Sequence, residues 1–373
     1  MPNKFTSKPY QGILARTFTH PGVQRIRKRL AAKVEVATLS VDLKTADSKI
    51  LRGLRNGAVT TLKEQVKVRL LKRARPVEVS HASVDQLKAA HLPKKMNDLA
   101  RSSLPIVFIH RSNSVYLKYS LSQARTSNPR SAVILLGDSS NDCYDFVVHR
   151  QIDDFFQSAT EFEKIYTHFS TLPPSFELIC FQRWFILKDF LLANKISRCL
   201  YLDSDIMLYT DVTADSEKFA HFDFTLAHQT NGCTFFLNRV AALEEFCQFL
   251  MDVYNKKDSY VYDKLLAHYV VRKRHGLAGG VCDMTAFQLY AENHFGEIGE
   301  VAHIIDGSVY DPAITILRPG FEMEGGIKKI FWRNGLPYGK QTNTGREIRF
   351  NSLHFHGSTS KLLMNQFYTG NAL

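Results

Sequence analysis

The chain has 373 residues with a net charge of +12 at pH 7, and 45% of them are hydrophobic. This composition is typical of a globular protein that buries a substantial core in one large domain or two smaller ones. The positive charge belongs to residues 1–100, which carry 21 Lys and Arg against 7 Asp and Glu, whereas residues 101–373 carry 27 against 29. The larger part is therefore nearly neutral, which argues against nucleic-acid binding.

Residues 1–100 are predicted to form a basic, largely helical N-terminal extension, and residues 101–373 a second domain. Apolar residues recur every four positions, with lysines and arginines beside them, at Ile50, Leu54, Ala58, Leu62, Val66 and Leu70. Two interpretations stay open: helices packed on the main domain, or a surface for an anionic partner such as the inner face of a membrane. No apolar run approaches the ~20 residues that span a bilayer, and the N-terminus has no secretory signal, so we expect a cytoplasmic protein.

From residue 106 onward, predicted strands alternate with predicted helices, which is the pattern of an α/β fold with a mostly parallel sheet. Strands are expected at residues 106–110, 132–136, 144–149, 199–202, 223–227 and 233–237. Helices are expected at residues 115–124, 176–194 and 241–254. Two glycine-containing segments, residues 321–326 and 334–339, are predicted to be loops that close over a ligand and exclude water.

An Asp-Ser-Asp sequence follows the most apolar of these strands. Asp203 and Asp205 come directly after Cys199-Leu200-Tyr201-Leu202 and before a second apolar stretch. In a strand, residues i and i+2 point to the same face, so the two carboxylates could hold one hard cation. Mg²⁺ in proteins takes one or two carboxylates and shares its other positions with water and phosphate oxygens. The alternative is a solvated turn in which both aspartates cap the next element.

Other segments accompany this motif in a recognisable order. Asn231-Gly232-Cys233-Thr234-Phe235-Phe236-Leu237-Asn238 comes after it, and His354-Phe355-His356-Gly357-Ser358-Thr359-Ser360-Lys361 lies near the C-terminus. Together with the Asp-x-Asp motif, these segments resemble nucleotide-sugar-dependent glycosyltransferases of the GT-A fold. The closest resemblance is to the glycogenin-like branch, family 8, although one extra residue precedes the lysine of its closing His-x-x-Gly-x-x-Lys element. The resemblance covers roughly residues 104 to 365.

The resemblance implies that Asp203, Asp205 and His354 bind a divalent metal. Asp205 would be the direct ligand, while Asp203 would contact the ribose or a metal-bound water. His356, two residues further on, is the alternative to His354. Imidazole suits Mn²⁺ better than Mg²⁺, so Mn²⁺ is the expected ion, and Lys361 would neutralise the β-phosphate of the leaving nucleotide. If the extra residue shifts its register, Lys361 is instead a surface lysine at the start of a helix.

The nucleotide is expected at the ends of the first two strands, because ligands gather at strand ends in open α/β sheets. His110 and Arg111 follow the first strand, and Asp138 follows the second. The resemblance implies that they bind the nucleotide, with Asp138 contacting the base, although turn chemistry alone also explains an aspartate there. Arg183, on the helix before the metal motif, could reach the base or the diphosphate because a guanidinium matches phosphate geometry. Its alternative role is a surface salt bridge.

Asp283 is the candidate residue on the acceptor side. It follows a pair of glycines and precedes an apolar helix, so it could simply cap the helix N-terminus. In the functional interpretation it contacts the donor sugar or accepts the acceptor's hydroxyl proton as a general base. The glycogenin-like resemblance implies retention of the anomeric configuration, whereas a general base aligned behind the anomeric carbon would invert it.

The leading hypothesis is a metal-dependent glycosyltransferase that moves a sugar from a UDP-linked donor to a hydroxyl of a glycan, glycolipid or protein. One alternative is a sugar-nucleotide hydrolase or nucleotidyltransferase that uses the same metal site. The sequence from His110 to Asn113 lacks the glycine-rich basic loop of pyrophosphorylases, which argues against a nucleotidyltransferase. The other alternative is a non-catalytic protein that binds nucleotide sugars or an anionic partner.

Overall fold

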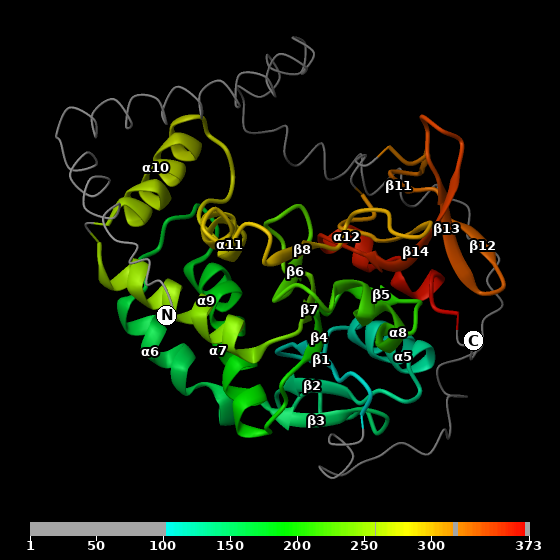
Figure 1. The fold of residues 1–373 in the computed structure, drawn as a ribbon, viewed down its shortest axis with the longest axis horizontal. Helices are drawn as coiled ribbons and strands as arrows, with labels where there is room; N and C mark the ends of the chain where they lie inside the picture. Colours follow the sequence, from blue (N-terminus) through cyan, green and yellow to red (C-terminus); the bar gives the residue numbers. More distant parts are fainter. Residues whose placement is uncertain (1–101, 258, 316–319, 370–373) are drawn as a thin grey trace, which may run out of the picture. The chain divides into compact units, whose positions relative to one another are not determined.

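The computed structural model describes residues 102–257, 259–315 and 320–369. The predicted helical extension over residues 1–100 and its boundary with the second domain lie outside these residues. The described residues form a mixed α/β fold with a mostly parallel central sheet and flanking helices, as the sequence predicts (Figure 1). No helix among the described residues combines the length and apolar character needed to cross a membrane.

A seven-stranded sheet forms the centre of the fold, with strand order β3-β2-β1-β4-β7-β6-β8. Within this sheet only β7 runs against the others, because it pairs antiparallel with both β4 and β6. The strands are β1 (Ile106–Ile109), β2 (Val133–Gly137), β3 (Val148–Gln151), β4 (Cys199–Leu202), β6 (Phe224–Leu226), β7 (Thr234–Leu237) and β8 (Ile298–Glu300). The carboxyl ends of β1, β2 and β4 therefore share one edge with the start of β7.

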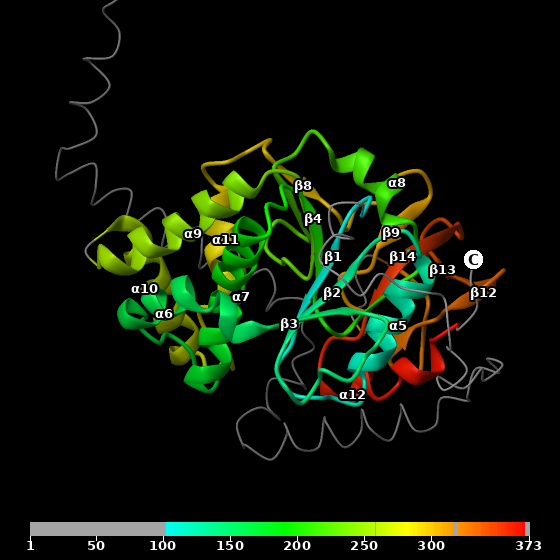
Figure 2. The same ribbon diagram turned by 90° about the horizontal axis from the view of Figure 1, so that it is seen from below.

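Each face of the sheet has its own hydrophobic core, because alternate strand residues point to opposite faces. Val107, Ile134 and Tyr201 belong to one core, and Phe108 and Leu135 to the other. The first face is covered by α6 (Gln157–Ile165), α7 (Pro174–Ala193), α9 (Val240–Asn255), α10 (Tyr260–Arg274) and α11 (Asp283–Ala291). The second is covered by α5 (Leu117–Ser127) and α8 (Val212–Ser216), and Figure 2 shows the two groups on opposite sides.

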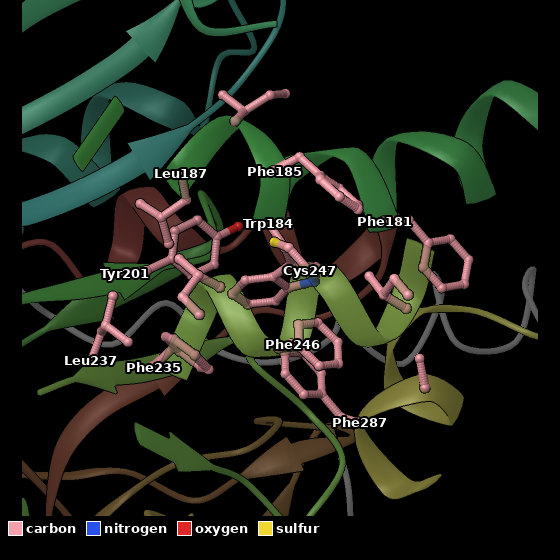
Figure 3. Close-up of a cluster of buried hydrophobic side chains, with 14 of the residues drawn as sticks. Phe181, Trp184, Phe185, Leu187, Tyr201, Phe235, Leu237, Phe246, Cys247 and Phe287 are labelled. Carbon is pink, nitrogen blue, oxygen red and sulfur yellow. The ribbon is translucent and has the colours of Figure 1, made fainter. Parts of the chain in front are cut away.

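Helix α7 is apolar on almost every side, which is typical of a helix buried within a domain. Its Trp184 side chain is fully buried, with ring centroids 5.2 Å from Tyr201, 4.9 Å from Phe235 and 4.9 Å from Phe287 (Figure 3). One indole therefore joins α7 to β4, β7 and α11. This packing fixes α7 against the strand that leads into the Asp-x-Asp motif.

A second sheet is built around β14 and has its own core beneath it. Its main order is β12-β13-β14-β5, and β9 also pairs with β14. These strands are β5 (Ile206–Leu208), β9 (Ser308–Tyr310), β12 (Phe331–Arg333), β13 (Leu336–Lys340) and β14 (Glu347–His354). The two-stranded sheet β10 (Met323–Glu324) and β11 (Ile327–Lys328) lies nearby in the chain, and α12 (Ser358–Lys361) follows β14.

The two segments predicted to be loops over the ligand are instead parts of β-hairpins. Residues 334–339 contain the turn between β12 and β13, where Asn334 and Gly335 have φ of 50° and 74°. An Asn-Gly pair with positive φ at both positions is the strongest short hairpin signal, and it outweighs the glycine content that suggested a loop. Residues 321–326 include β10 and the Gly325–Gly326 turn to β11.

Other differences from the sequence prediction concern boundaries. The third strand is at Val148–Gln151 and not at residues 144–149. Helices α6, α8 and α10 and strands β8 to β13 were not predicted. Asp283 is the first residue of α11, whose N-cap is Cys282, so it does not precede that helix as a cap.

Candidate functional site

The Asp-x-Asp motif forms the turn that joins β4 to β5. The Ile206 amide donates to the Asp203 carbonyl at 3.0 Å, and the Asp203 amide donates to the Cys233 carbonyl at 2.9 Å. On the other side, the Phe355 amide donates to the Asp205 carbonyl at 2.9 Å. The turn is therefore held by the start of β7 and by the end of β14, which lies some 150 residues later. This pairing brings the C-terminal segment to the motif.

Asp203, Asp205 and His354 form a group that could bind a metal, with their ligand atoms all within 4.8 Å of one another. The His354 Nε2 atom lies 3.3 Å from Asp205 Oδ1, and its Nδ1 atom donates to the Pro312 carbonyl at 2.7 Å. A backbone carbonyl only accepts, so Nδ1 carries a proton and Nε2 is the nitrogen that faces the carboxylates. Fixing the second ring nitrogen in this way is usual for metal-binding histidines.

His356, the alternative ligand, lies outside this group. It follows the end of β14 and is exposed, with its ring centroid 5.8 Å from that of His354. His354, by contrast, is 3% exposed. His354, and not His356, therefore belongs to the group that could bind a metal.

Lys361, at the end of α12, also reaches Asp205. Its Nζ lies 3.0 Å from Asp205 Oδ2 and 4.8 Å from the centre of the Tyr116 ring. Although burial disfavours a charged carboxylate, His354 and Lys361 together hold the pKa of Asp205 well below its usual range. The same Asp205 charge raises the pKa of His354 and of Lys361 against the opposing effect of burial. Lys361 therefore pairs with the carboxylate of this group and is not a free surface lysine.

Arg183 links Asp203, a member of this group, to Asp283, which lies outside it. Its guanidinium donates to Asp203 Oδ1 at 2.5 Å and to Asp283 Oδ2 at 2.5 Å through its two terminal nitrogens. It also stacks on Trp184, with the guanidinium carbon 4.9 Å from the ring centre. Although burial disfavours a charged guanidinium, the two carboxylates raise the pKa of Arg183. Arg183 therefore forms salt bridges, as its alternative role predicts, but they are largely buried and not on the surface.

Asp283 is buried, and hydrogen-bond donors surround its carboxylate. Oδ2 accepts from Arg183 and from the Trp184 indole nitrogen at 2.9 Å, while Oδ1 accepts from the Met284 amide at 3.0 Å. Tyr201 donates to Asp203 at 2.9 Å, which completes a connected network between the two aspartates. Asp283 is thus brought to the metal group through Arg183.

His110 lies between the strand-end loops and the metal group. Its Nδ1 atom is 2.9 Å from the Ser204 hydroxyl, and its Nε2 atom is 3.1 Å from the Ser114 hydroxyl. Burial and the nearby charge of Lys361 lower the pKa of His110 to about 4. His110 is therefore neutral at pH 7 and can donate or accept only one hydrogen bond through each ring nitrogen.

Asp138 is held in a turn by its neighbours. Oδ2 accepts from the Ser112 amide at 2.6 Å, and Oδ1 accepts from the amide and hydroxyl of Ser140 at 2.9 and 2.5 Å. These hydrogen bonds, with Ser140 contributing most, lower the pKa of Asp138. Arg111 lies beside this loop but pairs with Asp153 at 2.9 Å and packs on the Phe156 ring.

Sequence reasoning missed Asn141, which joins the two loops that bear these residues. Its side-chain amide donates to the carbonyls of His110 and Ser112, both at 2.9 Å, while its oxygen accepts from the Asp138 amide at 3.0 Å. In the sequence, Asn141 is only one polar residue of a predicted turn, a position that many polar residues could occupy. Tyr116 and Trp184 were also missed, because an aromatic residue in an apolar segment predicts only core packing.

No family model matches the chain, and no curated protein sequence matches it significantly. Among solved structures, mouse xyloside xylosyltransferase 1 is similar, with 11% identity and a TM-score of 0.36 over 55% of this chain and 87% of that chain. The glycosyltransferase GlyE of Streptococcus pneumoniae TIGR4 has 13% identity and a TM-score of 0.31 over 53% of this chain and 45% of that chain. Its apo form has 11% identity and a TM-score of 0.25, over 58% and 71%. None of these similarities is strong enough to identify the reaction.

Proposed function

We propose that this protein is a metal-dependent GT-A glycosyltransferase that transfers a sugar from a UDP-linked donor to a hydroxyl acceptor. The proposal depends on one observation: Asp203, Asp205 and His354 come together at the ends of sheet strands, with Lys361 on the same carboxylate. Two carboxylates and one imidazole are a donor set that suits Mn²⁺. The order of these residues along the chain supports the glycogenin-like branch.

Charge balance at the centre allows a divalent cation to bind at the imidazole. Asp203, Asp205 and Asp283 face Arg183 and Lys361, and Asp205 raises the pKa of His354, which favours a proton on that imidazole. A divalent ion that took the place of the Nε2 proton would add one positive charge to the centre, which would attract a diphosphate. When bound, the ion would offset the charge that develops on the diphosphate as the sugar departs. Lys361 would share that role from the opposite side of Asp205.

The uridine half of the donor is proposed to bind at the ends of β1 and β2. Asp138, whose oxygens accept three hydrogen bonds from Ser112 and Ser140, would offer the remaining lone pair of Oδ2 to the base. His110 would contact the ribose or phosphate region next to Ser204, and Arg111 would border the nucleotide from the outside. Asp203 would contact the ribose or a metal-bound water.

The donor sugar is proposed to lie beside Arg183 and Asp283. The Asp283 carboxylate already accepts hydrogen bonds from Arg183, from the Trp184 indole and from the Met284 amide, so its oxygens have little capacity left to take a proton from an acceptor. A positioning role therefore fits Asp283 better than a general base, and we propose retention of the anomeric configuration. Proton NMR of the first-formed product would decide: a product of inverted configuration would contradict this assignment.

The acceptor is proposed to approach past two adjacent loops next to Asp283. Thr171 and Gly279 exchange hydrogen bonds at 2.9 and 3.3 Å, which joins the two loops, and Leu172, Phe176 and Leu277 beside them are exposed. Exposed apolar side chains near a polar centre suit an acceptor with an apolar part, such as a glycolipid. We also propose three points that this geometry does not bear on: a glycan or a protein as the acceptor, a cytoplasmic location, and an anionic partner for residues 1–100.

Metal-dependent donor binding tests the function. Thermal stability would be measured with a panel of nucleotides and nucleotide sugars, with and without Mn²⁺, for the wild type and for Asp205→Asn. Asp145→Asn, an exposed aspartate in the same domain, is the matched control. A shift with one uridine nucleotide that needs Mn²⁺, survives in the control and vanishes in Asp205→Asn is expected.

The alternatives give different outcomes. If no nucleotide shifts the thermal midpoint of the wild type, the proposal is contradicted. Release of free UDP at the same rate with and without acceptors would favour a hydrolase. Binding without any turnover across an acceptor panel would favour a non-catalytic nucleotide-sugar-binding protein.

A further inference from the structure

A completely buried ion pair lies directly behind the metal-binding histidine. The side chains of Lys328 and Asp311 are both 0% exposed, and the Lys328 ammonium donates to Asp311 Oδ1. The same ammonium donates to the Ala313 carbonyl at 2.8 Å. Lys328 is in β11, whereas Asp311 follows β9, so the pair joins the small hairpin to the segment 311–314.

That segment surrounds His354. Asp311 Oδ2 accepts from the His354 amide at 3.3 Å, and the Ile314 amide donates to the His354 carbonyl at 2.8 Å. Between them, the Pro312 carbonyl accepts from His354 Nδ1 at 2.7 Å. The Lys328 ammonium thus touches the segment on both sides of the carbonyl that fixes the imidazole. Its own amide also donates to the Ile314 carbonyl, at 2.8 Å.

A buried ion pair is a poor means of stabilising a fold, because the cost of removing two charges from water offsets most of their attraction. Apolar residues of similar volume would fill this space at least as well. What apolar residues could not supply is a set of directional bonds that hold the Pro312 carbonyl in line with His354 Nδ1. Such outer contacts set the tautomer and the ring orientation of a metal ligand.

We propose that the Lys328–Asp311 pair is a positioning device that holds the 311–314 segment so that His354 presents Nε2 to the metal. This inference depends on the proposed metal-binding function. It assigns to both residues an effect on metal affinity that is separate from their effect on stability.

The test compares Mn²⁺ affinity with stability in a charge-free double variant, Lys328→Met with Asp311→Leu. Mn²⁺ binding to the full chain would be measured by electron paramagnetic resonance of the free ion, well below the melting temperature. A 10- to 100-fold weaker affinity is expected, the usual effect of removing outer contacts of a ligand, while the thermal midpoint stays near that of the wild type. Should the double variant not fold, Asp311→Asn, which conserves side-chain size, is expected to weaken Mn²⁺ affinity to the same extent, although it also lowers the thermal midpoint because the buried Lys328 charge loses its partner.

Leu243→Ala, in the core on the other side of the domain, is the control for general destabilisation. It should lower the thermal midpoint and leave Mn²⁺ affinity unchanged. Wild-type Mn²⁺ affinity retained in the folded double variant, or an equal loss in Leu243→Ala, would overturn the inference and leave the proposed function intact. Failure of the wild type to bind Mn²⁺ would instead overturn the proposed function.

Discussion

Arg183 is the residue on which the acidic part of the site depends. It is the cation that pairs with both Asp203 and Asp283, and its guanidinium is held between Trp184 and Tyr201. A lysine could not bind both carboxylates in this way, because an ammonium is a single point charge whereas the guanidinium presents one terminal nitrogen to each aspartate. The arrangement therefore couples the stability of the fold to the geometry of the candidate site through one side chain.

Replacing Arg183 by methionine should lower the free energy of unfolding by about 3–5 kcal/mol. Removing the guanidinium leaves the carboxylates of Asp203 and Asp283 in the protein interior without their positive partner. Urea unfolding measures this loss, and donor binding should fall with it. Arg239→Met, which breaks an exposed pair with Asp223, is the control and should change stability little. An equal effect in the two variants would contradict the network.

His110 should make stability depend on pH. Its pKa is lowered to about 4 in the folded protein, by burial and by Lys361, whereas an unfolded histidine has a pKa of about 6.5. The unfolded state therefore binds more protons between these values, and the stabilisation present above pH 6.5 is lost as the pH falls toward 4. The loss attributable to His110 is about 3 kcal/mol at pH 4.

Urea unfolding at several pH values checks this prediction. His110→Gln should show a smaller decrease in stability between pH 7 and pH 4 than the wild type. His303→Gln, at an exposed position, is the control and should follow the wild type. Parallel pH profiles for His110→Gln and wild type would rule the assignment out.

At the scale of elements, the site depends on close contact between α7 and the start of β7. A Cβ atom on Gly232 would lie 2.5 Å from the outer carbon of the Trp184 ring. The glycine therefore leaves the space that lets the indole reach Asp283. The close approach, and not the backbone conformation, explains a glycine at this position.

Gly232→Ala should displace Trp184, destabilise the fold by about 1–3 kcal/mol through overpacking, and weaken donor binding. Urea unfolding and tryptophan fluorescence measure the two structural effects. Adding Trp184→Phe removes the clashing ring atoms, so the double variant should lose less stability than the two single changes summed. Additive losses would show that the two side chains do not meet in this way.

At the scale of the whole molecule, charge is divided unevenly along the chain. Residues 1–100 account for an excess of 14 positive charges, and residues 101–373 for an excess of 2 negative charges. Basic segments are attracted to anionic membrane surfaces within a Debye length. Any such attraction should therefore come from the first hundred residues and not from the domain that contains the candidate site.

The full chain should co-sediment with vesicles that contain phosphatidylglycerol at low salt and dissociate as salt increases. A chain that starts at residue 101 should not bind them, provided that its thermal transition shows it to be folded. Vesicles of phosphatidylcholine alone are the control. Binding that is unaffected by salt, or equal binding by the shorter chain, would contradict an electrostatic role for residues 1–100.

The sequence alone determined the features that are local in the chain. The α/β alternation, the strand before Asp203, and helices α7 and α9 follow from apolar patterns a few residues long. The hairpin at Asn334–Gly335 could also have been predicted, because its turn signal is local, but glycine content was given more weight. Helix α10 has few buried residues, so its apolar period is weak and gave no prediction.

Only the tertiary structure decided which polar residues meet. Nothing in the sequence joins Arg183 to Asp283 across 100 residues, or His354 to the Lys328–Asp311 pair. These contacts arise because β14 pairs with β5 and because α7 packs beside α11, and such pairings are set by the burial of whole surfaces. Local patterns therefore identified candidate ligands, whereas their partners, protonation and orientation depended on packing between distant segments.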